Sequence, residues 1–280
     1  MAELCLVGYT YRGYEMAYAC AQARAFGYSS LELRDFRDVD LSTPAGVSDA
    51  LRRASRLAAD HGLTICSVFY APLPVSREGE REEEERAFGE VIAILAGFHV
   101  PILHTRLSLH RAGKGQEVVS ASALESDYEA ARETLSRVAR QAEKHGVRLA
   151  LESHMGTIHD TAASQWRIVF ACESPYVTAS LDFANLLIAH REESLGEAIR
   201  AFGPRIGYTH IKNVKLSPWG YDWNLPVRWG DINYYRVLQA LKEASYRGPL
   251  AVEYCGTGDP DVFVEDDANY LKSLIARVGL

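Results

Sequence analysis

Short, apolar, strand-like runs alternate with amphipathic helical patterns along the whole chain of 280 residues. Eight such pairs follow one another, separated by Gly and Pro turns, with no linker between them. The strand-like runs are Leu4–Tyr9, Ser29–Arg34, Leu63–Tyr70, Pro101–Leu107, Val147–Glu152, Val177–Asp182, Ile206–His210 and Leu250–Glu253. Strands that alternate with helices form parallel sheets, and eight of them predict a closed (β/α)₈ barrel.

This α/β fold, the TIM barrel, is expected to take in residues 1–280 as one domain. The helical patterns cover Glu15–Phe26, 44–61, 77–98, Ser126–His145, Thr161–Cys172, Glu193–Phe202, Asn233–Ala244 and Val262–Val278. The alternative is a doubly wound open sheet, which normally binds a nucleotide through a GxGxxG first turn. The first turn here reads TYRGYE, so the barrel is preferred.

Composition excludes several classes of function. The net charge is −7, and no basic stripe or tail is visible, which argues against binding to nucleic acid or to an anionic membrane. No apolar run is long enough for a bilayer span, and the first residues do not resemble a signal peptide. The five Cys are widely spaced and form no CxxC pair, which fits a reduced, cytoplasmic setting.

The last four strand-like runs each end in a side chain that can bind a metal ion. These side chains are Glu152, Asp182, His210 and Glu253. Active-site residues of such barrels sit at the carboxyl ends of the strands, so the four are expected to share one mouth. Carboxylates and one imidazole suit a single divalent ion, with Mn²⁺ preferred and Mg²⁺, Co²⁺ or Zn²⁺ as alternatives. One acidic residue at a strand end is more often a helix cap or an ion-pair partner, but four in succession favour a site.

A divalent ion chelated by a substrate's carbonyl and neighbouring hydroxyl would acidify the adjacent C–H bond. A carboxylate on each face could remove the proton and return it. The predicted function is therefore a metal-dependent isomerase or epimerase that acts on a sugar or polyol through an enediolate. The alternative is a lyase or dehydratase, in which the same intermediate expels a leaving group.

Several side chains outside this set are candidate contacts to the substrate. His104 lies on the fourth run and is as consistent with a core position as with a place in the mouth. Glu32 and Arg34 lie on the second run, and one of them is expected to face the barrel interior. Arg228 could bind a phosphate or hydroxyl, although a solvated loop position is the simpler interpretation.

The segment Val214–Gly230 carries three of the four Trp of the chain, among them Trp219 and Trp223. Aromatic rings suit the C–H faces of sugars, and they also form lids and subunit contacts. We expect this segment to form a lid over the mouth that influences substrate choice, with Trp219 as a candidate contact to the substrate. A homo-oligomer, in which these rings form a subunit contact, is the alternative.

The segments VRLALESHMG, SLDFAN, YTHIKN and WGDINYYRVLQALKEASYRGPLAVEY resemble the xylose-isomerase-like TIM-barrel superfamily. This group holds sugar isomerases and epimerases, inosose and 3-dehydroshikimate dehydratases, and endonuclease IV. The resemblance spans the chain and is strongest over residues 147–255. It implies that Glu152, Asp182, His210 and Glu253 hold the metal and that Glu152 and Glu253 are also the acid/base pair.

The resemblance further implies that His154 and Lys212 contact the substrate. Asn185 stands where many members have a His, and it is taken as another candidate contact. Ketose 3-epimerases of the group carry a Glu and an Arg at the places of Ile158 and Leu216, so that specific activity is not implied. An endonuclease is disfavoured because the chain is acidic and places few His at strand ends. A non-catalytic scaffold would bind no metal and tolerate Glu152→Gln.

Overall fold

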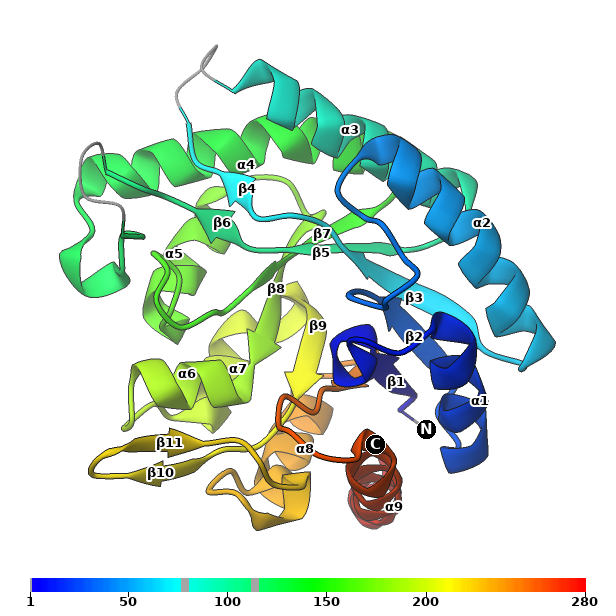
Figure 1. The fold of residues 1–280 in the computed structure, drawn as a ribbon. Coiled ribbons are helices and arrows are strands. Elements are labelled where there is room, and N and C mark those ends of the chain that lie inside the picture. The colour runs from blue at the N-terminus through cyan, green and yellow to red at the C-terminus, as the bar shows by residue number, and fades with distance from the viewer. Residues whose placement is uncertain (1, 77–80, 112–115) are drawn as a thin grey trace.

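Eight parallel strands close into a barrel in the computed structural model, which describes residues 2–76, 81–111 and 116–280 (Figure 1). Around the barrel the strands follow the order β1-β12-β9-β8-β7-β5-β3-β2. Their bounds are β1 Leu4–Val7, β2 Ser30–Leu33, β3 Thr64–Phe69, β5 Ile102–Thr105, β7 Arg148–Glu152, β8 Val177–Asp182, β9 Ile206–Ile211 and β12 Leu250–Val252. The predicted TIM barrel is confirmed, and each predicted run coincides with one barrel strand, although β9 extends one residue beyond its run.

Helices surround the strands on the outside of the barrel (Figure 1). Within the described ranges they are α1 Met16–Phe26, α2 Pro44–Asp60, α3 Glu82–Gly97, α4 Glu125–His145, α5 Ala162–Ala171, α6 Phe183–Ala189, α7 Leu195–Phe202, α8 Tyr234–Glu243 and α9 Pro260–Val278. The start of the predicted helix 77–98 falls on residues 77–80, which lie outside the described residues. Helix α6 was not predicted, because its apolar sequence FANLLIA follows the strand without a turn signal.

Helix boundaries follow from local chemistry. Thr43 accepts a hydrogen bond from the backbone N–H of Gly46, and Pro44 occupies the first turn, where its missing N–H costs nothing. Helix α1 ends at Gly27, whose φ of 77° is in the left-handed region that favours glycine. The Gly27 cap ends α1 shortly before β2 begins at Ser30.

Side chains of one strand alternate between two apolar layers. Leu4 and Leu6 belong to the large core between the barrel and its helices, whereas Cys5 and Val7 pack inside the barrel. The inner cluster also contains Tyr208 and is small. These side chains fill the barrel interior below the carboxyl ends of the strands. The polar groups at the strand ends therefore lie above a packed apolar layer.

Two small sheets extend from the barrel. Strands β4 Leu73–Pro74 and β6 Leu107–Ser108 pair in parallel, and β10 Lys215–Ser217 and β11 Gly220–Asp222 form an antiparallel hairpin. The hairpin lies in the segment that was expected to be a loop, and it projects from the molecule (Figure 1). None of the helices in the described ranges combines the length and apolar character that crossing a membrane would require.

Candidate active site

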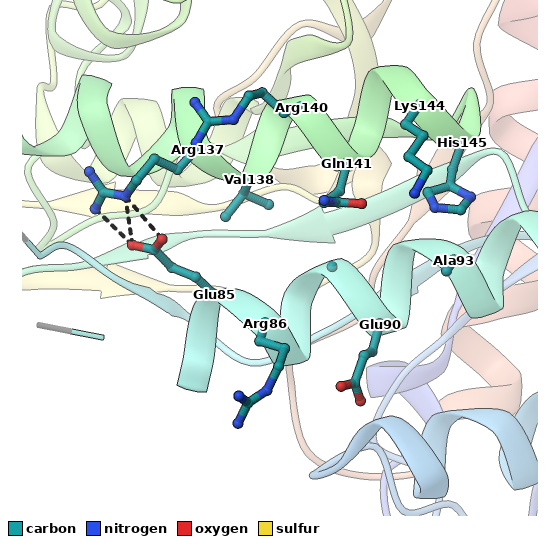
Figure 2. A pocket seen from close by; sticks show the side chains of 11 residues that line it. Glu85, Arg86, Glu90, Ala93, Arg137, Val138, Arg140, Gln141, Lys144 and His145 are labelled. Carbon is teal, nitrogen blue, oxygen red and sulfur yellow. Dashed lines mark hydrogen bonds and ion pairs between the residues drawn. The ribbon is translucent and has the colours of Figure 1, made fainter. Parts of the chain in front are cut away.

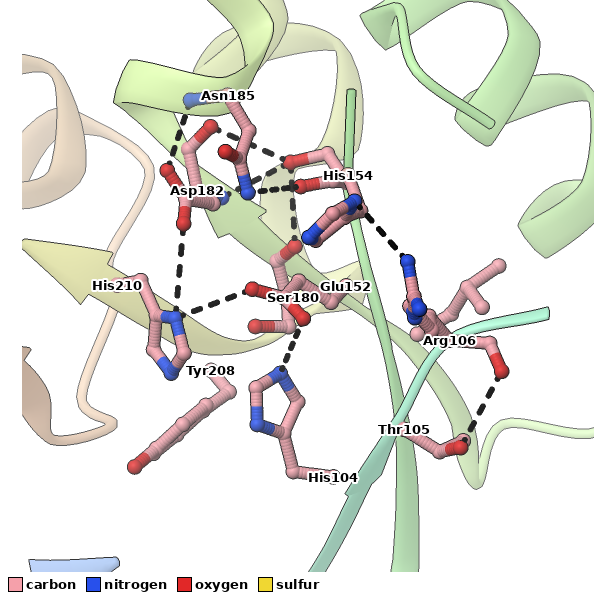
Figure 3. Close-up of polar contacts among 12 residues, drawn as sticks. His104, Thr105, Arg106, Glu152, His154, Ser180, Asp182, Asn185, Tyr208 and His210 are labelled. Carbon is pink, nitrogen blue, oxygen red and sulfur yellow. Dashed lines mark hydrogen bonds and ion pairs between the residues drawn. The ribbon is translucent and has the colours of Figure 1, made fainter. Parts of the chain in front are cut away.

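The carboxyl ends of β7, β8, β9 and β12 place four of the predicted residues next to one another. Nδ1 of His210 lies 3.2 Å from Oε1 of Glu152 and 3.6 Å from Oδ2 of Asp182 (Figure 3). Oε2 of Glu253, which directly follows β12, lies 3.7 Å from the same nitrogen. All four side chains are buried. The structure therefore gathers the predicted metal ligands around one imidazole nitrogen.

Three of these residues offer atoms that fit a metal ion. One ligand atom each of Glu152, Asp182 and His210 lies within 4.8 Å of the others. Oε2 of Glu152 and Nδ1 of His210 are buried, yet they make no hydrogen bond of good geometry to any described residue, and Oδ2 of Asp182 is paired with the Lys212 ammonium. Buried polar atoms without partners are costly, and oxygen and imidazole donors suit a divalent cation. The residues present fit the ion that the sequence predicts.

Asp182 is fixed by its place between a strand and a helix. Its Oδ1 accepts a hydrogen bond from the backbone N–H of Asn185, 2.9 Å away, and so caps α6. Its own backbone N–H donates to Oγ of Ser153 at 2.9 Å. The Asn185 side chain donates to the Ser153 carbonyl oxygen, which ties the ends of β7 and β8 together. Asn185 was predicted as a substrate contact. In the structure its side chain is buried and connects the ends of β7 and β8.

Lys212 lies among the ligand residues. Its Nζ is 2.8 Å from Oδ2 of Asp182 and 2.9 Å from Oε2 of Glu253. Burial lowers the pKa of a lysine, but these two carboxylates outweigh it and raise the pKa of Lys212 well above its usual value. Lys212 is therefore a buried ammonium held between Asp182 and Glu253.

Charge at the site is unbalanced. Among the described residues, the carboxylates of Glu32, Asp182 and Glu253 contact two side-chain cations, Arg34 and Lys212, and a fourth carboxylate, Glu152, contacts only histidines. Four negative charges minus two positive charges leave an excess of two, before any charge on histidine. A divalent cation would balance this excess.

Nearby positive groups set the ionisation of the carboxylates. Burial alone would raise the pKa of Glu253, but Lys212 and then His210 outweigh it and lower this pKa to about 2. Burial also disfavours a charged Glu152, yet hydrogen bonding to His210 lowers its pKa well below the usual value. In return, Glu253 overcomes the effect of burial and raises the pKa of His210 well above its usual value. Both glutamates are therefore in the form that can accept a proton.

Glu32 of β2 was not among the predicted site residues. Its Oε2 lies 3.0 Å from Nδ1 of His104 and 3.6 Å from Nε2 of His210, and Oγ of Ser67 donates to it at 3.0 Å. The signal was present, because Glu32 and Arg34 are two residues apart and share one face of the strand. Only one of the pair was expected to face inward, but both do, since Nη1 of Arg34 lies 3.6 Å from Oε1 of Glu253.

Of the predicted substrate contacts, His104 faces the site and His154 lies beside it. Nε2 of His104 is 4.0 Å from Oε2 of Glu152 and has no hydrogen-bond partner among the described residues. His154 is half-buried, with Nδ1 2.8 Å from the Met155 carbonyl oxygen and 3.3 Å from Nη1 of Arg106 (Figure 3).

Arg228 and Trp219 are not brought to these ligands. Arg228 forms an ion pair with Asp266 of α9, with 2.7 Å between Nη2 and Oδ1. Trp219 occupies the turn of the β10–β11 hairpin and is 96% exposed. Trp223 is the tryptophan that reaches the site, with its ring centroid 5.8 Å from Nζ of Lys212. Sequence alone pointed to the segment but not to the ring that faces the mouth.

A groove of about 620 Å³ lies elsewhere, between α3 and α4 on the outside of the barrel (Figure 2). Its most prominent contact is the ion pair between Glu85 and Arg137, in which Nη2 is 2.7 Å from Oε1. The charges that line it are of both signs, and it contains none of the residues at the carboxyl ends of the strands. The strand-end cluster, rather than this groove, is the candidate active site.

Comparison of the sequence with known proteins identifies a family. The family model described as xylose isomerase-like TIM barrel matches residues 20–274. A curated relative, the uncharacterized protein MJ1311 of Methanocaldococcus jannaschii, is 28% identical over 150 residues, which are 52% of this chain and 50% of that protein. The match thus spans about half the length of the relative.

Solved structures of similar fold include three with informative descriptions. A xylose isomerase-like TIM barrel protein from Mycobacterium smegmatis in complex with magnesium has a TM-score of 0.76 at 18% identity, over 99% of this chain and 98% of that one. The probable 3-DHS dehydratase AsbF from Bacillus anthracis has a TM-score of 0.75 at 15% identity, over 96% and 98%. D-allulose 3-epimerase from Methylomonas sp. in complex with D-allulose has a TM-score of 0.75 at 17% identity, over 97% and 96%.

At these identities the structures show a shared fold, whereas the family model covers most of the chain. The sequence resemblance carried by the strand ends is thereby confirmed. The protein belongs to the xylose isomerase-like TIM-barrel family.

Proposed function

We propose that this protein is a divalent-metal-dependent isomerase or epimerase of a sugar or polyol, which acts by proton transfer next to a carbonyl. The observation that supports it most directly is the placement of two ionised carboxylates beside one imidazole nitrogen. Glu152 and Glu253 come from β7 and from the end of β12, with β8 and β9 between them in the barrel. They flank the position where a substrate carbon would lie.

Glu152, Asp182, His210 and Glu253 would hold the ion, with Mn²⁺ preferred. When bound, a divalent ion would polarise a substrate carbonyl and lower the pKa of the neighbouring C–H bond. One of the two glutamates accepts the proton from carbon, and an enediolate results. Delivery of a solvent-derived proton to the opposite face by the other glutamate, which must first take up that proton, gives the epimer, and return of the first proton to the neighbouring carbon gives the isomer.

The remaining side chains orient the substrate. Lys212 offers a buried ammonium beside Glu253, and His104 offers a ring nitrogen beside Glu152. Hydroxyl and carbonyl oxygens of a carbohydrate can accept from the first and bond to the second. D-Allulose, the ligand of the Methylomonas epimerase of similar fold, belongs to the same substrate class.

The test is isotope exchange. The Mn²⁺-loaded protein is incubated in D₂O with a panel of ketoses, inososes and keto-glycosides, and the products are analysed by mass spectrometry. We expect a gain of one mass unit at an otherwise unchanged formula. Glu152→Gln and Glu253→Gln should each slow this exchange by about 10²–10⁴-fold, the usual contribution of a general acid or base. Glu173→Gln, an exposed carboxylate-to-amide change, is the matched control and should leave the rate unchanged. No exchange with any member of the panel would contradict the proposed substrate class.

Elimination is the second candidate, and the position of Lys212 favours it. An ammonium that already lies 2.9 Å from the base Glu253 can protonate a leaving hydroxyl once the C–H proton has been removed. A probable dehydratase is also among the structures of similar fold. Products that have lost water in the same experiment would assign the protein to this class instead.

A further inference from the structure

One carboxylate oxygen below the metal ligands is surrounded by donors. Oε2 of Glu32 lies 3.0 Å from Nδ1 of His104, 3.6 Å from Nε2 of His210 and 3.0 Å from Oγ of Ser67. The Ser67 hydroxyl is in turn 2.9 Å from the Tyr208 hydroxyl. Every one of these side chains is fully buried. Because bulk water does not reach Glu32, its partners are the groups that the barrel supplies.

The outer nitrogens of the two imidazoles face the other way. Nδ1 of His210 lies 3.2 Å from Oε1 of Glu152, and Nε2 of His104 lies 4.0 Å from Oε2 of Glu152. Neither nitrogen has a hydrogen-bond partner of good geometry among the described residues. Nδ1 of His104 is thus within hydrogen-bond distance of Glu32, Nε2 of His210 faces the same oxygen at 3.6 Å without a hydrogen bond of good geometry, and each ring has its other nitrogen in the site.

Tautomer choice follows from this arrangement. A neutral imidazole carries one N–H and one lone pair, and an ionised carboxylate can only accept a hydrogen bond. The nitrogen that faces Glu32 must then carry the proton, and the nitrogen in the site must carry the lone pair. A cation at Nδ1 of His210 needs that lone pair, which leaves the single proton of the ring on Nε2, directed at Glu32.

We propose that Glu32 is a positioning residue that fixes both imidazoles at once. It holds His210 as the tautomer that presents Nδ1 to the metal, and it holds His104 as the tautomer that presents Nε2 to a substrate hydroxyl. The inference rests on the proposed function only in that the site binds a divalent ion. It does not depend on which reaction is catalysed.

A different use of the same residues is a second metal site, since Glu32, His104 and His210 also have ligand atoms within 4.8 Å of one another. It would require His210 to bind one ion through each nitrogen, with no proton left on the ring. A hydrogen bond between His104 and Glu32, with Nε2 of His210 facing the same oxygen at 3.6 Å, explains the geometry without that condition, and metal stoichiometry separates the two interpretations.

The experiment uses Zn²⁺, which is diamagnetic, and needs no substrate. Long-range ¹H–¹⁵N spectra of ¹⁵N-histidine-labelled protein report the tautomer of each ring, with assignment by His104→Gln and His210→Gln. In the Zn²⁺-loaded wild type we expect His210 to be protonated on Nε2, His104 to be protonated on Nδ1, and one ion to be bound per chain. In Glu32→Gln the loss of the charge should mix the His104 tautomers and weaken Zn²⁺ binding, measured by calorimetry, by about 10–100-fold.

Asp267→Asn is the matched control, because it changes another buried carboxylate to an amide at a position on α9 that bonds to Val227 instead. It should alter neither the tautomers nor the Zn²⁺ affinity. A folded Glu32→Gln protein with wild-type tautomers and affinity would overturn the proposal, as would two Zn²⁺ per wild-type chain. If Glu32→Gln does not fold, the wild-type spectrum still decides, because His210 protonated on Nδ1 or His104 protonated on Nε2 contradicts the role of Glu32. Failure of the carbohydrate assay would leave these readouts unaffected.

Discussion

Nζ of Lys212 lies 2.8 Å from Oδ2 of Asp182, the oxygen that remains after Oδ1 has capped the following helix. The ammonium is therefore bound to the oxygen that Asp182 has left for a metal ion. Two cations close to one buried oxygen repel each other, since the low effective dielectric constant of the interior screens them weakly. Lys212 and a divalent ion are thus expected to compete, and the competition can be measured.

Lys212→Met should tighten Mn²⁺ binding by about tenfold, because the like charge next to the ion is gone. The same change should lower the melting temperature of the ion-free protein, because Asp182 and Glu253 lose their shared counter-ion. Calorimetric titration and thermal unfolding with and without Mn²⁺ check both effects. Lys215→Met, which removes an exposed lysine paired with Asp231, should change neither. Weaker Mn²⁺ binding in Lys212→Met would show that the ammonium supports the ion instead of competing with it.

The two tryptophans of the β10–β11 region should differ in their effect on catalysis. The Trp223 ring lies 5.8 Å from Nζ of Lys212, where an aromatic face can cover a bound sugar, whereas Trp219 is 96% exposed at the hairpin turn. We expect Trp223→Ala to raise KM by about 3–10-fold, which is equivalent to about 1 kcal/mol of lost contact. Steady-state kinetics with the substrate found in the exchange screen provide the measurement, and Trp219→Ala serves as the control. Equal effects of both changes would assign the hairpin a role other than covering the site.

The sequence predicted the barrel and the residues at the ends of its later strands because both depend on local patterns. Short apolar runs and the Gly turns after the helices identify each unit, and a closed barrel brings strand ends together whatever the loops do. Glu152, Asp182, His210 and Glu253 could therefore be proposed as neighbours without coordinates.

Other features depend on contacts between distant segments. Glu32 lies 72 residues before His104, and nothing in either strand indicates that they share a proton. The turn that exposes Trp219 and directs Trp223 inward depends on a hairpin of two three-residue strands, too short to leave a pattern. The position of Arg228 depends on its ion pair with Asp266 of α9, a contact that the sequence does not indicate.

Asp267 should make the protein less stable as the pH rises through neutrality. It is 1% exposed, and burial raises its pKa to about 7, although the backbone N–H of Val227 donates to Oδ1 at 2.6 Å and partly opposes this. A carboxyl group whose pKa is higher in the folded than in the unfolded state stabilises the fold at low pH. That contribution is lost as the pH rises through the folded value.

Asp267→Asn keeps an acceptor for Val227 and cannot ionise. Its stability relative to wild type should therefore increase between pH 5 and pH 8, by about 1–3 kcal/mol. Urea unfolding of the two proteins at several pH values across this range gives the difference directly. Parallel stability curves would mean that Asp267 has an ordinary pKa.

His159 should make the protein less stable as the pH falls below about 6.5, which is the opposite direction to the effect of Asp267. Its Nε2 accepts a hydrogen bond from the backbone N–H of Leu107 at 3.0 Å, and Nδ1 lies 3.2 Å from Oγ1 of Thr157. Burial, together with the charge of His154, lowers the pKa of His159 to about 3. The unfolded chain therefore binds a proton below about pH 6.5 that the folded protein excludes, so stability present above that pH is lost as the pH falls toward 3.

His159→Gln can keep the acceptor for Leu107 without a titrating group. We expect it to unfold like the wild type, or slightly more easily, at pH 7.5, but to be more stable than the wild type by about 1–3 kcal/mol at pH 4.5. Chemical denaturation at the two pH values tests this crossing, and His190→Gln, at an exposed position, should shift neither curve. If the variant were less stable at both pH values by the same amount, His159 would matter through its packing alone. A crossing would show that a neutral imidazole, buried outside the proposed metal site, links the β6 segment to the loop that follows β7, and that acid breaks this link.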